Sequence, residues 1–419
     1  MQKVNKTIFF LLVFTVLFIF IRSINYIYHL YWSGDQARCG IEALKIFRTK
    51  TLTLIGPEIS ATFQGRFIFQ GPITYYFYLL FLLFGRWDPV VSSYLFMIFC
   101  SLMIFPLFFG TKKLVNEKVA WFMVIIYTLV PYYINYTRFL WNSTFLFSLV
   151  PILIYLMGQY TEKKSPLLFF LISFWLGLLL QFHYQFILVI LGIFLYYFLY
   201  KKLKIVYLPL FIFGIAFGLS PLILFELRHG FYNLKTMILF MQNWDKVAKP
   251  GGIATPHYYI SSSFMAILAL SGLLKKFIDR VSYKYFFVGI IFFIVYSFFI
   301  YVPKPEHAFW AYTSPWNYLS EKKIYDTIKQ TGLKKNFNIA NLAYYDTLST
   351  VVKYFMKRDG YNIAYDDYYN NKYLFVISEK NKYLSHHAYE ISTFKPFKIL
   401  NQWKINNSYN MLLLKREKK

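Results

Sequence analysis

Nine long apolar runs separated by short polar segments constrain this chain more than any other feature. Each run is long enough, or nearly so, to cross about 30 Å of hydrocarbon as a helix. The expected spans cover residues 7–30, 92–110, 118–137, 139–158, 166–181, 184–200, 205–226, 257–274 and 284–302. Of the 419 residues, 58% are hydrophobic and only 15% are charged. This hydrophobic content exceeds what a soluble domain needs for its core. The sequence predicts a polytopic α-helical membrane protein.

Charge and cysteine usage narrow the class further. The formal net charge is +26, but Lys and Arg form short clusters between apolar runs and no continuous stripe. This distribution favours membrane topology signals over nucleic-acid binding. The N-terminal run has a long apolar core and no small-residue cleavage pattern, so we expect an uncleaved first span. Cys39 lies in a polar loop and Cys100 in an apolar run, so no disulfide between them is expected.

The basic clusters predict which loops share one side of the membrane. They are Lys3/Lys6, Lys112/Lys113/Lys118, Lys163/Lys164, Lys201/Lys202/Lys204 and Lys275/Lys276/Arg280/Lys284. All of them fall on the cytoplasmic side if the short apolar segment 72–85 is an interfacial helix that does not cross. If that segment crossed, only the first cluster would be cytoplasmic. We therefore expect about nine spans, a cytoplasmic N-terminus and an outer first loop over 31–91.

The last third of the chain has a different character. Apolar runs shorten to strand length after residue 302, and polar residues become frequent. NFNIANLA, KYLFVIS and NMLLLKRE are typical of strands, and TLSTVVKYFMKRDG is typical of a helix that ends at Gly360. The sequence thus predicts a transmembrane domain over 1–302 and a small extracytoplasmic α/β domain over 303–419.

Polar and ionisable residues near the span ends gather on the expected outer side. The candidates for a functional site there are Asp35, Arg38, Glu58, Arg66, Gln70, Arg138, Asn142 and His183. The middles of the spans hold almost no charge, with Arg22 as the main exception. An ion-coupled transporter usually needs ionisable groups near the midplane, so this pattern favours chemistry at the outer boundary.

Each candidate also has a plainer interpretation. Gly34-Asp35 precedes a periodic stretch, so Asp35 could serve as a helix N-cap. Arg138 could anchor the chain to lipid headgroups, and His183 could be an interfacial side chain hydrated by water.

The residue types at the outer boundary suit one kind of substrate. The sequence has no Walker A loop, nucleophile elbow, HExxH or Cys-rich metal pattern. A carboxylate, several cations and aromatic surface at a lipid boundary suit a substrate with an apolar tail and a phosphate. Arg138 and Arg66 could hold phosphate oxygens, and Asp35 could take a proton from an acceptor hydroxyl.

The same residues carry a family resemblance over roughly residues 1–230. GDQARCGIEALKIFRTKTLTLIGPEIS, FQGPITYYFYLLFLLFG, TRFLWNST and QFHYQF, in this order, resemble the bacterial C-type glycosyltransferases. The nearest group is family 39, with protein O-mannosyltransferases and lipid A aminoarabinose transferases as relatives. The resemblance implies an integral membrane enzyme that transfers a sugar from a polyprenyl-phosphate donor on the outer side, with inversion.

The resemblance also implies roles for individual residues. Asp35 matches the acidic residue of the first loop that such families use as catalytic base, and Arg138 matches an Arg at the outer end of the third span. Gln70 falls where relatives have a Lys or a His facing the donor phosphate. Asn142 falls where several relatives have a second Asp, and Glu58 is the alternative second carboxylate.

The resulting expectation is a glycosyltransferase of the bacterial inner membrane. It would use a polyprenyl-phosphate sugar as co-substrate and no other cofactor, with metal dependence undecided by the sequence. Its acceptor would be a lipid, glycan or protein, without nucleic acid. Segment 72–85 would shape the lipid groove, and the outer domain would cover or select the acceptor. The alternatives are a flippase for lipid-linked glycans, which should have a polar path through its spans, and a non-catalytic scaffold, which should tolerate Asp35→Asn.

Overall fold

The computed structural model describes residues 2–247, 260–301, 316–343, 346–380, 384 and 388–417. They form two compact units that each draw on several parts of the chain. Unit 1 comprises Met1–Ile24, Lys50–Phe81 and Tyr94–Tyr301, and unit 2 comprises Asn25–Thr49, Leu82–Ser93 and Val302–Lys419. The first loop, expected to belong to the membrane domain as a whole, is therefore divided between the units.

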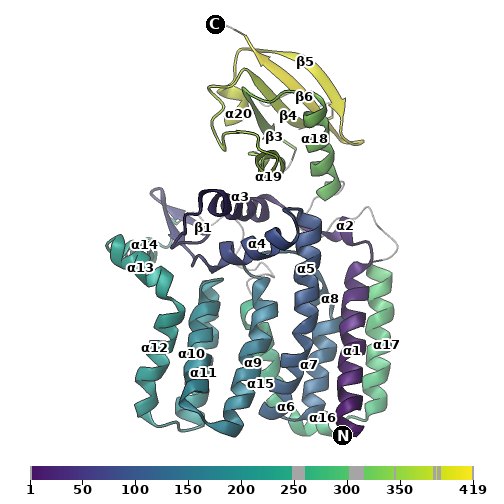
Figure 1. Cartoon of the computed structure of the whole chain (residues 1–419), viewed down its shortest axis with the longest axis vertical. Coiled ribbons are helices and arrows are strands. Elements are labelled where there is room, and N and C mark those ends of the chain that lie inside the picture. The colour runs from purple at the N-terminus through teal and green to yellow at the C-terminus, as the bar shows by residue number, and fades with distance from the viewer. Residues whose placement is uncertain are drawn as a thin grey trace. The chain divides into compact units, whose positions relative to one another are not determined.

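Unit 1 is built mainly from apolar helices (Figure 1). They are α1 (Gln2–Ser23), α5 (Pro89–Leu102), α6 (Ile104–Leu114), α7 (Glu117–Leu129), α8 (Pro131–Tyr136), α9 (Phe145–Lys163), α10 (Pro166–Leu180), α11 (Ile187–Phe194), α12 (Leu208–Gly218), α13 (Ser220–Arg228), α14 (Tyr232–Gln242), α15 (Ile260–Leu273), α16 (Lys275–Arg280) and α17 (Tyr283–Tyr301). Short helical turns η1 (Tyr184–Phe186) and η2 (Leu195–Tyr200) flank α11, and η3 (Ile205–Tyr207) precedes α12.

Within the described ranges, three helical segments are long and apolar enough to cross a membrane, namely Lys6–Ser23, Pro89–Leu114 and Phe145–Lys163. Among the described residues, Ile205–Gly218 and Ser220–Arg228 would make a fourth if counted as one broken span. Together with several shorter apolar helices, these segments fit a membrane-embedded protein.

Several expected spans differ from the helices observed. The stretch 205–226 is not one straight helix, because it bends by 75° between α12 and α13. The stretch 118–137 is interrupted where Pro131 starts α8, since Pro favours a first helical turn and cannot continue the helix before it. The helix expected from residue 139 begins only at Phe145, after a non-helical segment.

The segment expected to be an interfacial helix is α4 (Ile73–Phe84). Figure 1 shows α4 running crosswise to α9 and α10. Its Tyr78 hydroxyl donates to the Leu140 carbonyl at 2.8 Å, and the Phe77 ring lies 5.3 Å from the rings of both Phe145 and Phe182. Because Phe145 starts α9 and Phe182 follows α10, α4 packs across the ends of those helices.

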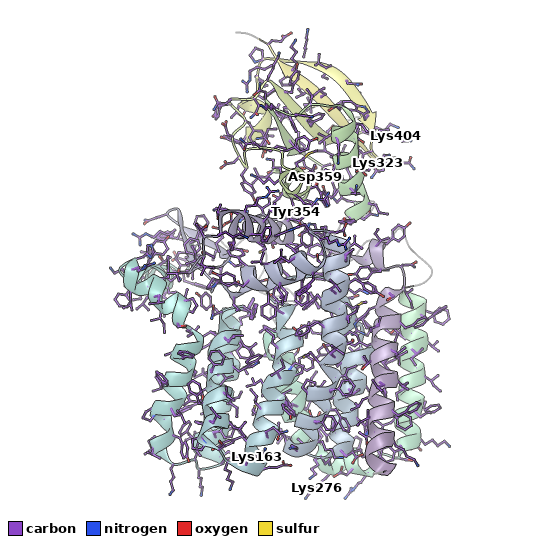
Figure 2. The ribbon with its side chains drawn as sticks, viewed as in Figure 1. Lys163, Lys276, Lys323, Tyr354, Asp359 and Lys404 are labelled. Carbon is purple, nitrogen blue, oxygen red and sulfur yellow. The ribbon has the colours of Figure 1, made fainter. Side chains whose placement is uncertain are left out.

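The opposite end of unit 1 carries basic side chains. Lys113 of α6 bonds Glu162 of α9 at 2.6 Å, and Lys118 of α7 donates to the Asp279 carbonyl of α16 at 2.6 Å. Figure 2 shows Lys163 and Lys276 at this same end. Basic clusters far apart in the sequence therefore gather at one end, as the topology argument requires, while the membrane side that this end faces stays a prediction.

Unit 2 contains a four-stranded sheet in the order β3-β4-β6-β5. The strands are β3 (Phe337–Asn341), β4 (Tyr373–Glu379), β5 (Phe397–Lys404) and β6 (Tyr409–Arg416), with α18 (Tyr318–Gln330), α19 (Thr350–Arg358) and α20 (Tyr389–Ser392). β3 and β4 are parallel, and the other pairs are antiparallel. β5 and α18 were not anticipated. The six central residues of β5 are exposed or half-buried, so this strand lacks the apolar pattern that revealed the others.

The first loop contributes α2 (Tyr26–His29) and α3 (Gly34–Thr49) to unit 2. α3 packs closely on α19, because a Cβ atom at Gly40 would lie only 2.8 Å from the Tyr354 ring. Arg48 of α3 donates to the Lys357 carbonyl at 2.8 Å and to the Arg358 carbonyl at 2.9 Å. Both carbonyls lie in the last turn of α19, so Arg48 caps that helix.

Candidate functional site

Asp35 lies in the first turn of α3 and is exposed. The N-cap of this helix is Ser33, since its carbonyl accepts the first intrahelical bond from the Ala37 N–H at 2.9 Å. The Gln36 side chain accepts from both the Ser33 N–H, at 3.1 Å, and the Ser33 hydroxyl, at 2.6 Å. The cap and its reciprocal side chain are therefore Ser33 and Gln36. The interpretation of Asp35 as the cap is wrong.

A second carboxylate, which the sequence analysis missed, lies beside the start of α3. A Cβ atom at Gly34 would lie 3.2 Å from Cγ of Asp346, so only glycine lets the two approach without a shift. Asp346 is held by Thr350, whose backbone N–H and hydroxyl donate to its carboxylate at 2.6 and 2.8 Å. Burial raises the pKa of Tyr31 to about 12, the hydrogen bond with Ser33 opposes the rise, and the charges of Asp35 and Asp346 add to it. Both carboxylates thus act on the same hydroxyl.

Arg38, a candidate for substrate binding, is bonded to the C-terminal part of unit 2. Its Nε donates to the Tyr365 hydroxyl at 3.1 Å. Lys353, which is fully buried, donates to the Tyr365 carbonyl at 2.6 Å and to the Tyr368 hydroxyl at 3.2 Å. Burial lowers the pKa of Lys353 to about 7, and the charge of Asp346 partly offsets this effect. A buried lysine inside TVVKYFMKR is visible in the sequence only as a charge on an otherwise apolar helix face.

The loop end of unit 1 brings together motifs that are distant in the sequence. We use "loop end" for residues 69–72, 138–144 and 181–185. The Asn142 amide donates to Gln70 Oε1 at 2.8 Å, and Gln70 is only 5% exposed. The Gly71 N–H donates to the Gln181 carbonyl at 3.1 Å. FQGP, TRFLWNST and QFHYQF are thus joined through hydrogen bonds.

Three buried amide oxygens at the loop end have no hydrogen-bond partner within the described part of the chain. They are Oδ1 of Asn142 and Oε1 of Gln181 and Gln185. Gln181 is fixed at its other end, where Nε2 donates to the Gly218 carbonyl at 2.5 Å. Such acceptors suit a ligand with hydroxyl donors, because leaving a buried oxygen unsatisfied costs about 1–3 kcal/mol.

His183 follows Gln181 by two residues and lies at the N-cap of η1, in extended backbone. The neighbouring Tyr184 hydroxyl donates to the Phe69 carbonyl at 2.5 Å. The turn carrying His183 is therefore held against the strand that leads into Gln70.

Arg138 is fully buried, and its Nη2 donates to the carbonyls of Ile21 and Ile24 at 3.1 and 3.3 Å. Arg22 is also fully buried and donates to the Tyr127 and Thr128 carbonyls, each at 2.9 Å. Both arginines thus satisfy carbonyls at helix ends, α1 for Arg138 and α7 for Arg22. The structure gives Arg138 a supporting contact in place of an exposed guanidinium at a lipid headgroup.

Glu58 and Arg66 lie on the hairpin of β1 (Glu58–Phe63) and β2 (Arg66–Phe69), and both are exposed. Its two-residue turn has Gln64 and Gly65 at positive φ, as a tight hairpin with right-handed twist requires. Gln70 follows this hairpin directly. Arg66, Glu58, Gln70, Asn142, Arg138 and His183 therefore belong to unit 1, whereas Asp35 and Arg38 belong to unit 2.

No group of three or more His, Cys, Asp or Glu side chains able to hold a metal occurs among the described residues. Comparison with protein-family models, with curated proteins and with solved structures found no match to this chain.

Proposed function

We propose that the protein is a membrane glycosyltransferase that moves a sugar from a polyprenyl-phosphate donor to a hydroxyl of a lipid, glycan or protein acceptor. The observation that carries the proposal is the joining of FQGP, TRFLWNST and QFHYQF at the loop end by the Gln70–Asn142 and Gly71–Gln181 hydrogen bonds. These are the segments on which the family resemblance rests. The buried acceptors there, on Asn142, Gln181 and Gln185, suit the hydroxyls of a sugar.

In this proposal Asp35 is the general base. It takes the proton of the acceptor hydroxyl as that oxygen attacks the anomeric carbon. The bond from that carbon to the phosphate oxygen breaks, and the polyprenyl phosphate leaves with the electron pair, so the configuration inverts. Asp35 is exposed in the first turn of α3, so an acceptor hydroxyl can approach its carboxylate from solvent.

The two arginines Arg66 and Arg138 have different roles in this proposal. Arg66 is exposed on its hairpin and is the cation that we assign to the donor phosphate. Arg138 holds the end of α1 through its carbonyl contacts and supports the loop that carries Asn142.

The test is transfer of labelled sugar from a panel of polyprenyl-phosphate sugars to membrane extract. Wild type is compared with Asp35→Asn and with Glu42→Gln, which removes a carboxylate that pairs with Lys45 on the same helix. We expect Asp35→Asn to lower transfer by about 100-fold or more and Glu42→Gln to leave it unchanged. Equal transfer by wild type and Asp35→Asn would refute Asp35 as the base. Transbilayer movement of the labelled lipids without transfer would instead identify a flippase.

A further inference from the structure

A basic pocket lies at the edge of the unit 2 sheet, outside every group used above. It has a volume of about 900 Å³. Its cationic side chains are Lys372, Lys395, Lys398, Lys415 and Arg416, and its one carboxylate is Glu417. Such an excess of one sign in a concave surface concentrates counter-ions and anionic ligands.

The pairing of β5 with β6 brings two of these lysines together, which lowers the stability of the sheet. Lys398 of β5 stands directly opposite Lys415 of the neighbouring antiparallel β6, so both side chains project from the same face. Like charges in directly opposed positions destabilise a pair of strands. β5 is an edge strand, where lysine also discourages pairing with other chains, but that function needs no second lysine opposite the first.

Arg416 differs from the lysines because it is used by the fold. Its guanidinium donates to the carbonyls of Asn371, Thr393 and Tyr368 at 3.1, 3.2 and 2.7 Å. These bonds fix the loop that forms the pocket wall. Lys398 and Lys415 repel each other without stabilising the fold in this way. An anionic ligand is therefore the simplest compensation for their repulsion.

The rest of the lining indicates which kind of anion fits. Tyr369 is 58% exposed, and Asn370 and Asn371 donate their amide N–H groups to Asp367 at 2.9 and 2.8 Å, which fixes both amides at the rim. An exposed aromatic face attracts the C–H groups of a sugar ring, and amides bond its hydroxyls. A simple inorganic anion would use neither group.

We propose that this basic pocket binds an acidic glycan, with lysine ammonium groups on its carboxylates and Tyr369 beneath a sugar ring. The proposed glycan binding does not depend on transferase activity. Only the interpretation of this glycan as the acceptor of the reaction rests on the proposed function. Because binding and transfer are measured separately, failure of one does not decide the other.

The experiment measures binding to the full chain in detergent by calorimetry, with a short oligogalacturonate, the matched neutral oligogalactose and inorganic polyphosphate as probes. We expect the oligogalacturonate to bind and the neutral glycan not to bind. Lys415→Gln should weaken binding by about tenfold or more, the size of one hydrogen bond to a charged group, and should raise the melting temperature by relieving the repulsion. Lys334→Gln, which removes an exposed lysine elsewhere in unit 2, should change neither quantity.

Two results would overturn the proposal. One is unchanged oligogalacturonate affinity in Lys415→Gln, whose greater stability would exclude misfolding as an explanation. The other is polyphosphate binding as tight as oligogalacturonate binding, together with no loss of glycan affinity in Tyr369→Ala. That outcome would show a general anion site in place of a glycan site.

Discussion

The buried acid Glu321 allows a quantitative prediction about stability and pH. Glu321, in the first turn of α18, is 1% exposed and accepts a hydrogen bond from the Trp316 indole N–H at 2.9 Å. Burial raises its pKa from 4.5 to about 8, the charge of Asp346 adds to the rise, and the bond from Trp316 opposes it. The folded protein therefore holds this proton over a pH range in which the unfolded chain releases it.

The sign and the size follow from linkage. An acid with a raised folded-state pKa stabilises the fold fully below pH 4.5, and this contribution is lost as the pH rises to about 8. A rise of that extent corresponds to about 5 kcal/mol. Glu321→Gln stays neutral at every pH and keeps an acceptor for Trp316. The variant should match wild type near pH 4.5 and become more stable above it, by about 10 °C or more in melting temperature near pH 8.

Lys353 has the opposite pH dependence. Burial lowers its pKa from 10.5 to about 7, so the fold carries a penalty below pH 7 that disappears as the pH rises to 10.5. Together the two groups predict a stability minimum for unit 2 between about pH 7 and 8. In Glu321→Gln the decrease on the acid side should vanish, while the increase on the alkaline side should persist.

The assay is thermal unfolding of the full chain in detergent, followed by tryptophan fluorescence from pH 4.5 to 10. Glu379→Gln, in the same unit but exposed, serves as the control and should follow wild type. The reasoning is refuted if Glu321→Gln is less stable than wild type at pH 8, or if the difference between them does not change with pH.

Three further variants test the packing and the loop end. Gly40→Ala places a methyl group 2.8 Å from the Tyr354 ring, so we expect a loss of about 1–3 kcal/mol in a thermal melt, and an unchanged melt would contradict the packing of α3 on α19. Arg22→Leu leaves helix-end carbonyls without their donor and should destabilise the chain by about 2 kcal/mol or more, as measured by melting against Lys163→Leu as control. Asn142→Ala removes the bond to Gln70 and one buried acceptor, and should raise KM for the donor sugar more than it lowers kcat in the transfer assay.

Much of the candidate site could be recognised from the sequence because its segments are short, polar and placed between apolar runs. Gln70, Asn142 and Gln181 fall at the boundaries of such runs, and the structure joins the segments that carry them. The geometry of individual side chains could not be recognised in this way. Arg138 and an exposed arginine look alike in sequence, yet Arg138 is fully buried against α1, because its position depends on how distant helices pack.

The sequence by itself determined the class of the protein, because the number and length of the apolar runs determine how much apolar surface must be buried away from water. It also determined the central strands of unit 2, whose short continuous apolar runs are typical of strands buried on both faces. Only the tertiary structure decided that α3 belongs to unit 2, that Ser33 rather than Asp35 caps it, and that Asp346 lies beside Gly34. The approach of Asp346 to Gly34 joins residues more than 300 positions apart. No local pattern encodes such a contact, because it depends on how α3 and α19 pack and on glycines that let the backbones come close.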